Sequence, residues 1–188
     1  MATIFPEQYD DKWTNSYDEV AAIKEQDDYV FQKCLNVYCF ENKSNNVENK
    51  LKRFIEVIHK NYKGNHYHNF LHALHVFNST TILWENLCDS VCFDFTPIEH
   101  LALLISALVH DVEHPGGFNS LLFGKDIAII YNDQSILENN SLTFTFQLLQ
   151  EDEYNFLINM SKTEIQKFRK TVIDLVLGTD IGNHIRNE

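Results

Sequence analysis

Basic residues are scarce in this sequence, which has 15 Lys and Arg against 27 Asp and Glu and a formal net charge of −12. Proteins that bind along a nucleic-acid backbone usually carry a basic face. No basic cluster occurs here, so the sequence argues against nucleic acid as a partner. An acidic protein can still bind an anionic substrate where bound cations reverse the local field. The charge therefore excludes one class of partner and leaves anionic small molecules open.

The sequence also lacks segments that would target the chain to a membrane. Residues 1–11 have no basic stretch followed by an apolar one, so no secretory signal is indicated. The longest apolar run, Leu101 to Val109, is far too short to span a bilayer. Cysteine is rare too, and the four present lie in apolar helical patterns that predict buried side chains rather than disulfides or a zinc site (Cys34, Cys39, Cys88 and Cys92). We predict a cytoplasmic protein with no membrane partner.

Strand signals are missing as well, because alternation is weak and no Asn-Gly or Asp-Gly pair occurs. Apolar residues instead repeat at helical spacing, most clearly from Val47 to Tyr62. The sequence therefore predicts an all-α, compact multi-helix domain, with a helical lead-in over residues 1–46 and the main part over residues 47–188. Helices are expected over residues 16–24, 29–38, 47–62, 69–89, 97–110, 119–123, 127–131, 136–150 and 162–184. Lys63-Gly64-Asn65 is expected to stop the third of these, Asn69 to cap the fourth, and Ser135 to cap the eighth.

Two of these helices begin with strong N-terminal signals. Thr96 is followed by Pro97 and Glu99, which predicts an N-cap, a first helical residue and a capping acid. This helix is apolar nearly all round and should form the buried centre of the fold. Ser161 and Glu164 match a capping box, and the apolar face of the helix they begin continues to Ile185. Because the pattern runs to the end of the chain, we expect a fragment that is truncated at its C-terminus.

Histidines are concentrated in two segments, which contain six of the nine in the chain (His66, His68, His72, His75, His110 and His114). His68 and His72 are four residues apart and would share one face of a helix, although a pair of this kind can also be a surface coincidence. His110 and Asp111 end the most apolar helix, where an unpaired carboxylate would be costly and a bound cation would remove the cost. Adjacent helical residues suit one metal bound by both, or two metals bridged by Asp111.

Three histidines are not expected to bind metal. His114 lies one turn beyond His110 and is expected to hydrogen-bond near the metal ligands rather than to bind metal. His59 and His100 lie in ordinary helical context, so a structural role is predicted for both.

Five motifs in register resemble the catalytic domain of the class I 3′,5′-cyclic-nucleotide phosphodiesterases, which are HD-type metal phosphohydrolases. The resemblance extends from about residue 50 to the end of the chain and is faint before it. Its motifs are Tyr67-His68-Asn69-x-x-His72-Ala73, then Ala107-x-Val109-His110-Asp111-Val112-Glu113-His114-Pro115-Gly116, Tyr131-Asn132-Asp133-x-Ser135-x-Leu137-Glu138-Asn139, Val172-Ile173-Asp174-Leu175-Val176-Leu177 and Thr179-Asp180-x-x-x-His184.

This resemblance implies two divalent metal ions. Zn²⁺ would bind to His72, His110 and Asp111, and Asp111 would bridge to a second ion, Mg²⁺ or Mn²⁺. The waters on these ions would be oriented by three further side chains (His114, Glu138 and Thr179).

The resemblance also implies the reaction. His68 would be the general acid that protonates the departing 3′ oxygen, and Tyr67 would shape the pocket wall. The cyclic nucleotide would lie against Tyr67, His68, His72 and Asp111, and a metal-activated hydroxide would open its ring. A protonated imidazole within reach of a poor leaving group contributes roughly 10²–10⁴ in rate.

The sequence departs from the family pattern at four positions. His75 and Glu113 stand where the family usually has Asp, and Asn140 and Ser141 stand where it usually has His. The family's fourth protein ligand to the first metal, its purine-binding glutamine and its aromatic clamp come from later helices that this chain does not contain.

The main hypothesis is hydrolysis of cAMP or cGMP to the 5′-monophosphate in cyclic-nucleotide signal transduction. Activity of the isolated chain is in doubt, and the sequence does not separate the two nucleotides or predict an oligomeric state. The alternative is a truncated or degenerate phosphodiesterase-like domain that binds metal or nucleotide without turnover. Two other hypotheses, a different HD-type phosphohydrolase and a helical scaffold with structural histidines, agree less well with the spacing of the motifs.

Overall fold

The computed structural model describes residues 19–37, 45–90 and 95–182. In these ranges every regular element is a helix, which confirms the predicted all-α class. The helices are α1 (Glu19–Val37), α2 (Asn45–Asn61), α3 (Phe70–Ser90), α4 (Pro97–Val109), the 3₁₀ turn η1 (Asn119–Leu122), α5 (Asp126–Ile130), α6 (Ile136–Leu148) and α7 (Lys162–Leu177). None of them combines the length and the apolar character that a bilayer-spanning segment requires.

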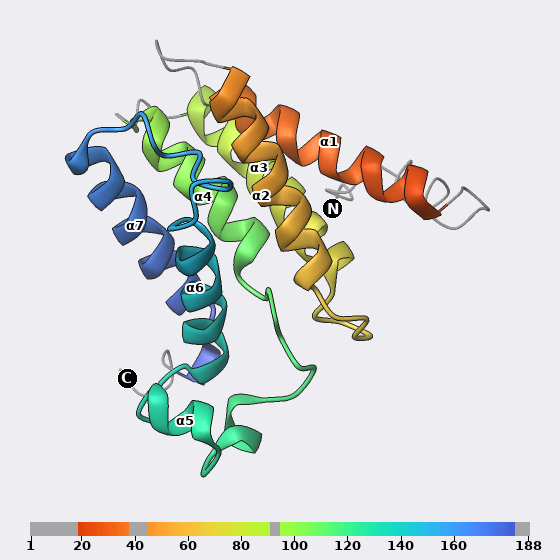
Figure 1. Ribbon diagram of the computed structural model, residues 1–188, viewed down its shortest axis with the longest axis vertical. Coiled ribbons are helices and arrows are strands. Elements are labelled where there is room, and N and C mark those ends of the chain that lie inside the picture. Colours follow the sequence, from red (N-terminus) through yellow and green to blue (C-terminus); the bar gives the residue numbers. More distant parts are fainter. Residues whose placement is uncertain (1–18, 38–44, 91–94, 183–188) are drawn as a thin grey trace.

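Helix α4 lies at the centre of the molecule, with α1 and α3 packed on one side and α6 and α7 on the other (Figure 1). Nine of its 13 residues are buried, as its apolar pattern predicts. Its start is also as predicted, because the backbone N–H and the hydroxyl of Thr96 donate to the Glu99 carboxylate at 2.9 and 2.6 Å. A buried central helix places its C-terminal end, and so His110 and Asp111, within reach of the surrounding helices.

The N-terminal helical region is one helix, α1, where the sequence predicted two segments ending at residue 24 and beginning at residue 29. Two of the polar residues between these segments contact a neighbouring helix. Asp27 contacts Nδ1 of His59 on α2 at 2.7 Å, and Asp28 pairs with Lys52 at 2.9 Å. Because α2 supplies partners for these carboxylates, a polar stretch that looked like a break continues as helix.

The last helix was predicted to reach His184, and this is wrong, because α7 ends at Leu177. Gly178 occupies the C-cap and donates its N–H to the carbonyl of Asp174 at 3.0 Å. After Gly178 the backbone bonds span three residues instead of four, from Thr179 to Val176 at 3.1 Å and from Asp180 to Leu177 at 3.3 Å. The α-helix therefore ends although its apolar pattern continues. The start of α7 is as predicted, since Ser161 and Glu164 form the capping box.

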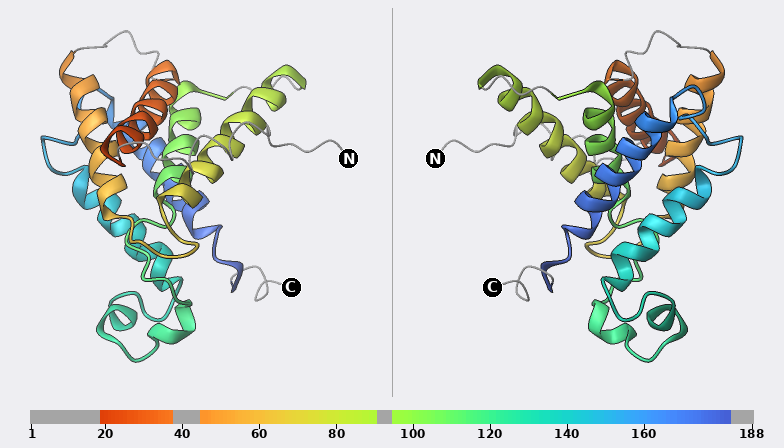
Figure 2. Two further views of the ribbon diagram at one scale, coloured as in Figure 1. Left: turned by 90° about the vertical axis from the view of Figure 1, so that its right-hand side faces the viewer. Right: turned by 90° about the vertical axis from the view of Figure 1, so that its left-hand side faces the viewer.

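Between α4 and α6 the chain forms a projection that carries η1 and α5, at the lower end of both ribbon views (Figures 1 and 2). It returns to the body at Ser135, the predicted start of α6. The Ser135 hydroxyl does not cap that helix but donates to the Asp180 carboxylate at 2.7 Å. This contact ties the beginning of α6 to the turn after α7.

Two other predictions are tested by the structure only in part or not at all. Cys34 is fully buried as expected, whereas Cys39, Cys92 and the side chain of Cys88 lie outside the described residues. The boundary at residue 46 stays a prediction, although Val30 of α1 belongs to the same core as α2 and α4.

Candidate metal centre

Two histidine-bearing segments meet beside the C-terminal end of α4. One is the connection between α2 and α3, which leads into His72 in the first turn of α3. The other is the segment after α4, which begins with His110 and Asp111. Asn69 caps α3 as predicted, since its side-chain oxygen accepts the N–H of His72 at 3.0 Å. That cap fixes where the first turn of α3 begins, and therefore where the His72 side chain projects.

Three ligand atoms from these segments converge. Nε2 of His72 lies 3.3 Å from Nε2 of His110, and Oδ2 of Asp111 lies 3.5 and 3.2 Å from these two nitrogens. Ligands that lie about 2.0–2.2 Å from one zinc ion are separated by roughly 3–3.5 Å. The three side chains therefore fit a single cation, and the structure brings together the set that the sequence singled out.

The tautomer of His110 suits a metal ligand. Its Nδ1 lies 3.0 Å from the carbonyl oxygen of Ala107, which can only accept a hydrogen bond. The proton of the neutral ring is therefore on Nδ1, and the lone pair of Nε2 points toward His72 and Asp111. Metal-bound imidazoles commonly donate their other N–H to a carbonyl in this way.

Asp111 is the electrostatic centre of the group, and its side chain is only 13% exposed. Burial alone would raise the pKa of its carboxyl, but hydrogen bonds and charge from His110 and then His68 outweigh burial and hold the pKa well below its usual range. In return, the carboxylate raises the pKa of His110 against the lowering effect of burial. The pKa of His72 is lowered, first by burial and then by the charge of His110. A neutral His72 and an ionised Asp111 are the states that bind a cation.

His68 and His114 form a second group on the same carboxylate. Nδ1 of His68 lies 2.8 Å from Oδ2 of Asp111, and its ring stacks on that of His114 with centroids 3.7 Å apart and planes 20° apart. His114 is buried, its Nδ1 accepts the N–H of Gly116 at 3.0 Å, and burial lowers its pKa to about 4. We call His68, His72, His110, His114 and Asp111 the His–Asp cluster.

The other predicted site residues, Tyr67, Glu138 and Thr179, differ in how they interact with this cluster. Tyr67 is 63% exposed, and its ring centroid lies 4.4 Å from that of His72, so it forms an open wall. Glu138 accepts a hydrogen bond from Asn119 at 2.9 Å, and burial raises its pKa, with further increases from Asp180 and Asp111. Thr179 is exposed, with its hydroxyl bonded to Val176. The charge of Asp111 therefore affects the pKa of Glu138. Among the described residues, no contact links Thr179 to the cluster.

Two residues that sequence reasoning treated as helix residues or helix stops also contact the site. The Tyr62 hydroxyl donates to the carbonyl of Leu108 at 2.9 Å and accepts the N–H of Asp111 at 3.3 Å. The Asn65 amide donates to the carbonyls of His68 and His114. A tyrosine on an apolar helical face and an asparagine in a turn are ordinary signals, so neither could be recognised from its neighbours in sequence.

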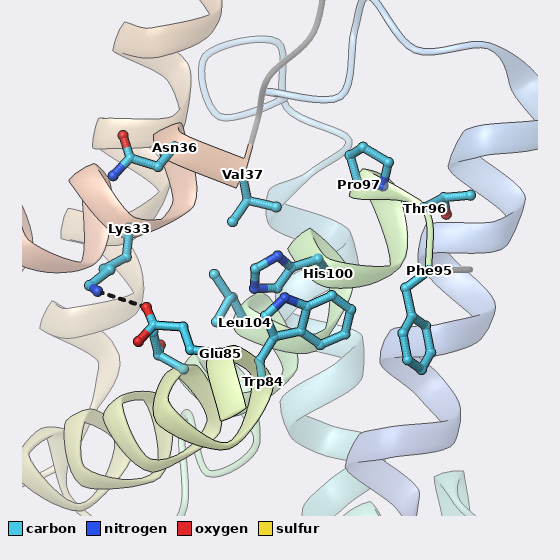
Figure 3. Close-up of a pocket in the computed structure, with 11 residues that line it drawn as sticks. Lys33, Asn36, Val37, Trp84, Glu85, Phe95, Thr96, Pro97, His100 and Leu104 are labelled. Carbon is cyan, nitrogen blue, oxygen red and sulfur yellow. Dashed lines mark hydrogen bonds and ion pairs between the residues drawn. The ribbon is translucent and has the colours of Figure 1, made fainter. Parts of the chain in front are cut away.

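A separate cavity of about 410 Å³ lies between α1, α3 and the start of α4 (Figure 3). His100 stacks there on Trp84, with ring centroids 4.0 Å apart, and Phe95 lies against the same indole. Lys33 and Glu85 pair at 3.4 Å on its rim. Nε2 of His100 is buried without a hydrogen-bond partner in the described part of the chain. Burial lowers the pKa of His100 to about 4. We call this region the His100 cavity; among its described lining residues, no set of ligand atoms converges as in the His–Asp cluster.

The fold and the site define the class of protein: an all-helical protein whose histidine and aspartate side chains could hold a divalent metal. Comparison with known proteins makes this specific. The family described as 3′5′-cyclic nucleotide phosphodiesterase matches residues 67–187. The chain therefore belongs to the 3′,5′-cyclic nucleotide phosphodiesterase family.

The relatives agree on the family and differ in the nucleotide that their names specify. A probable 3′,5′-cyclic-AMP phosphodiesterase of Caenorhabditis elegans is 40% identical over 141 residues, 73% of this chain and 20% of that protein. A dual-specificity calcium/calmodulin-dependent 3′,5′-cyclic nucleotide phosphodiesterase of Drosophila melanogaster is 36% identical over 163 residues, 84% of this chain and 19% of that protein. The chain thus spans about a fifth of the length of these relatives.

Solved structures give the same result for the fold. The phosphodiesterase domain of a rhodopsin–phosphodiesterase fusion protein from the choanoflagellate Salpingoeca rosetta matches with a TM-score of 0.75 and 32% identity. A second structure of that domain matches with a TM-score of 0.76 and 30% identity. Each match covers 92% of this chain, and 52% and 50% of the two solved chains. The described helices therefore correspond to about half of such a domain.

Proposed function

We propose that this protein hydrolyses 3′,5′-cyclic nucleotides, cAMP or cGMP, to 5′-monophosphates. The observation that carries the proposal is the convergence of His68, His72 and His110 on one carboxylate, Asp111, in a chain of this family. The family is metal-dependent, and the donor set fits a metal. We assign His72, His110 and Asp111 as ligands of a first ion, Zn²⁺, and Asp111 as the bridge to a second, Mg²⁺ or Mn²⁺. When bound, such ions supply Lewis acidity and lower the pKa of coordinated water.

His68 is the proposed proton donor. Its Nδ1 is engaged with Asp111, which fixes the tilt of the ring and leaves Nε2 as the nitrogen that can carry a proton to the substrate. The His68 side chain is 32% exposed, so a bound nucleotide could reach it. Protonation of the 3′ oxygen as its bond to phosphorus breaks avoids the release of a free alkoxide.

The remaining assigned residues would hold the nucleotide and water around these groups. Tyr67 forms the wall beside His72, and Tyr67, His68, His72 and Asp111 line the proposed substrate position. The neutral His114 ring accepts the N–H of Gly116 and stacks on the ring of His68, which helps to hold that ring in place. Glu138 and Thr179 are proposed to orient water, Glu138 through a carboxyl group whose raised pKa lets it exchange a proton more readily.

A second candidate function is binding of metal or nucleotide without turnover. It is favoured by one observation, that the chain covers only about half of the solved phosphodiesterase domains. One experiment separates the two: incubation of the purified chain with cAMP and with cGMP, with and without a chelator, followed by chromatography of the products. Chelator-sensitive 5′-monophosphate supports the enzyme. Its absence from a chain that still binds Zn²⁺ leaves only the binding function.

A further inference from the structure

We propose that Asn65 is a positioning residue that clamps the His68 segment to the His114 segment and thereby holds His68 in its working position. The inference rests on the proposed function, because it concerns the proton donor of that site. One side-chain amide supplies both N–H groups of this clamp. Asn65 Nδ2 donates to the carbonyl oxygen of His68 at 2.9 Å and to that of His114 at 2.8 Å.

These two bonds connect segments that are far apart in sequence. His68 belongs to the connection that leads into α3, and His114 to the segment that follows α4. A primary amide has two donor hydrogens, and the two contacts use both, so the amide is fully committed to the bridge. The carbonyls joined in this way belong to the two residues whose rings stack at 3.7 Å.

Asn65 is itself held from both sides. Its own carbonyl accepts the side-chain N–H of Asn69 at 2.8 Å, and Asn69 is the residue that caps α3. On the other side its Oδ1 lies so close to Gly116 that a Cβ added there would be only 2.9 Å away, and Gly116 has a φ of +91°. The glycine both adopts a left-handed conformation and leaves space for the amide. Asn65 is therefore fitted into the turn between the two segments.

Other contacts join the same segments. The bond from Nδ1 of His68 to Asp111 fixes the tilt of the His68 ring, and two further bonds act farther from the rings. The N–H of Glu113 bonds the carbonyl of Asn61 at 3.2 Å, and Lys63 donates to the carbonyl of Glu113 at 3.0 Å. These two bonds hold Glu113, whereas the Asn65 bonds hold the backbone carbonyls of His68 and His114. Loss of the Asn65 amide should thus separate the rings of His68 and His114 without removing the general association of the segments.

The test uses the isotope-labelled 188-residue chain and nuclear Overhauser effects between the ring protons of His68 and His114. Asn65→Ala removes both donors, and Asn65→Asp replaces them with oxygen of nearly the same shape. We expect the inter-ring signals in the wild type and their loss in both variants. The matched control is Asn61→Ala, which removes an amide whose hydrogen bond in the described residues goes to the carbonyl of Val57, four residues earlier in its own helix. Retained signals in the Asn65 variants, or equal loss in the control, would overturn the clamp.

A second measurement needs no variant. The Asn65 side-chain amide protons of the wild type should exchange slowly with solvent, because both are hydrogen-bonded, and rapid exchange of either would also overturn the clamp. Zn²⁺ titration is a third readout. The Zn²⁺ affinity of Asn65→Ala should fall by less than the roughly 10-fold expected for a residue that orients a metal ligand, because in the described part of the chain the Asn65 side chain bonds the carbonyls of His68 and His114 and not a proposed ligand. A larger fall would place the role of Asn65 at the ligands instead of at His68.

If the chain turns over cyclic nucleotide, Asn65→Ala should lower kcat by roughly 10²-fold with little change in KM, since misplacement of a reacting group by about 1 Å has that effect. If the wild type has no turnover, the proposed function fails, and the ring signals and amide exchange still decide whether Asn65 is a clamp. Turnover with an unchanged kcat in Asn65→Ala would refute the positioning role and leave the proposed function intact.

Discussion

Two histidines on and next to α4 have opposite electrostatic environments. His110, directly after the helix, is buried beside Asp111, and the carboxylate raises its pKa although burial lowers it. His100, in the first turns of the helix, is half-buried against Trp84, and burial lowers its pKa to about 4. The difference shows what a carboxylate does in an apolar setting. Burial alone makes a histidine a neutral ring, whereas burial beside an ionised aspartate creates a site that attracts a cation.

Removal of that carboxylate should have the largest effect. In Asp111→Asn the three imidazoles lose the oxygen that all of them contact. We expect a loss of metal affinity well above the roughly 100-fold upper range for residues that only orient ligands, together with loss of turnover. Metal content by mass spectrometry and product formation are the measurements. Asp174→Asn, which changes an exposed carboxylate on α7, is the control and should bind metal as the wild type does. Wild-type metal content in Asp111→Asn would show that the bridging assignment is wrong.

The proton donor should be separable from the ligands. His68→Asn is expected to keep its metal and to lose roughly 10²-fold or more in turnover, because the ring that protonates the leaving oxygen is removed. Steady-state kinetics and metal analysis on the same samples measure both effects. The control is His75→Asn, the same substitution at an exposed position one turn after His72. Equal rates for His68→Asn and wild type would refute the general-acid role.

Metal binding should also stabilise the fold through the His–Asp cluster. At a free Zn²⁺ concentration of 100 times Kd, a ligand that binds only the folded state contributes about 2.7 kcal/mol, which corresponds to a rise in Tm of roughly 5–10 °C for a chain of this length. Thermal denaturation with Zn²⁺ and with chelator measures it. The rise should be absent in Asp111→Asn and present in His100→Phe. A rise of the same size in Asp111→Asn would place the stabilising metal elsewhere.

The smallest expected effect concerns His100. The folded-state pKa of about 4 lies below the ordinary value of 6.5, so the unfolded chain binds more protons between these values. The stability associated with a neutral His100 is complete above pH 6.5 and is lost as pH falls toward 4. His100→Phe keeps a ring on Trp84, removes the buried nitrogen that lacks a partner, and should raise the free energy of unfolding by about 1 kcal/mol.

Urea denaturation at several pH values measures this effect, and the advantage of His100→Phe should grow as the pH falls from 6.5. If the variant and the wild type lost stability in parallel over this range, His100 would not be the group responsible.

The predictions that the structure confirms rest on local signals. Thr96, Pro97 and Glu99 marked the start of α4, and Asn69 marked that of α3, because caps are contacts between residues three positions apart. The errors arose where the pattern of apolar and polar residues did not decide the outcome. Asp27 looked like a helix break in the sequence, but it pairs with His59 of the distant helix α2. In α7 the backbone bonds change to a spacing of three residues at Thr179 and Asp180, and the continuing apolar pattern does not signal that change.

The site residues also divide into those with local sequence signals and those defined by distant contacts. The spacing of His68 and His72 and the adjacency of His110 and Asp111 could be read directly, as could the resemblance to the phosphodiesterases. Asn65 could not, because its two acceptors belong to different segments and its importance follows from a glycine 51 positions later that leaves room for it.

The order of residues along the chain settled the helical class, the starts of the main helices, the family and the identity of the candidate ligands, because each depends on patterns within a few turns. Packing of α3 against α4 settled that one oxygen of Asp111 meets three imidazoles, that His68 stacks on His114, and that His100 stacks on Trp84. Such contacts join side chains up to 46 residues apart, as far apart as His68 and His114, and only helices already packed together can bring them to a few ångströms.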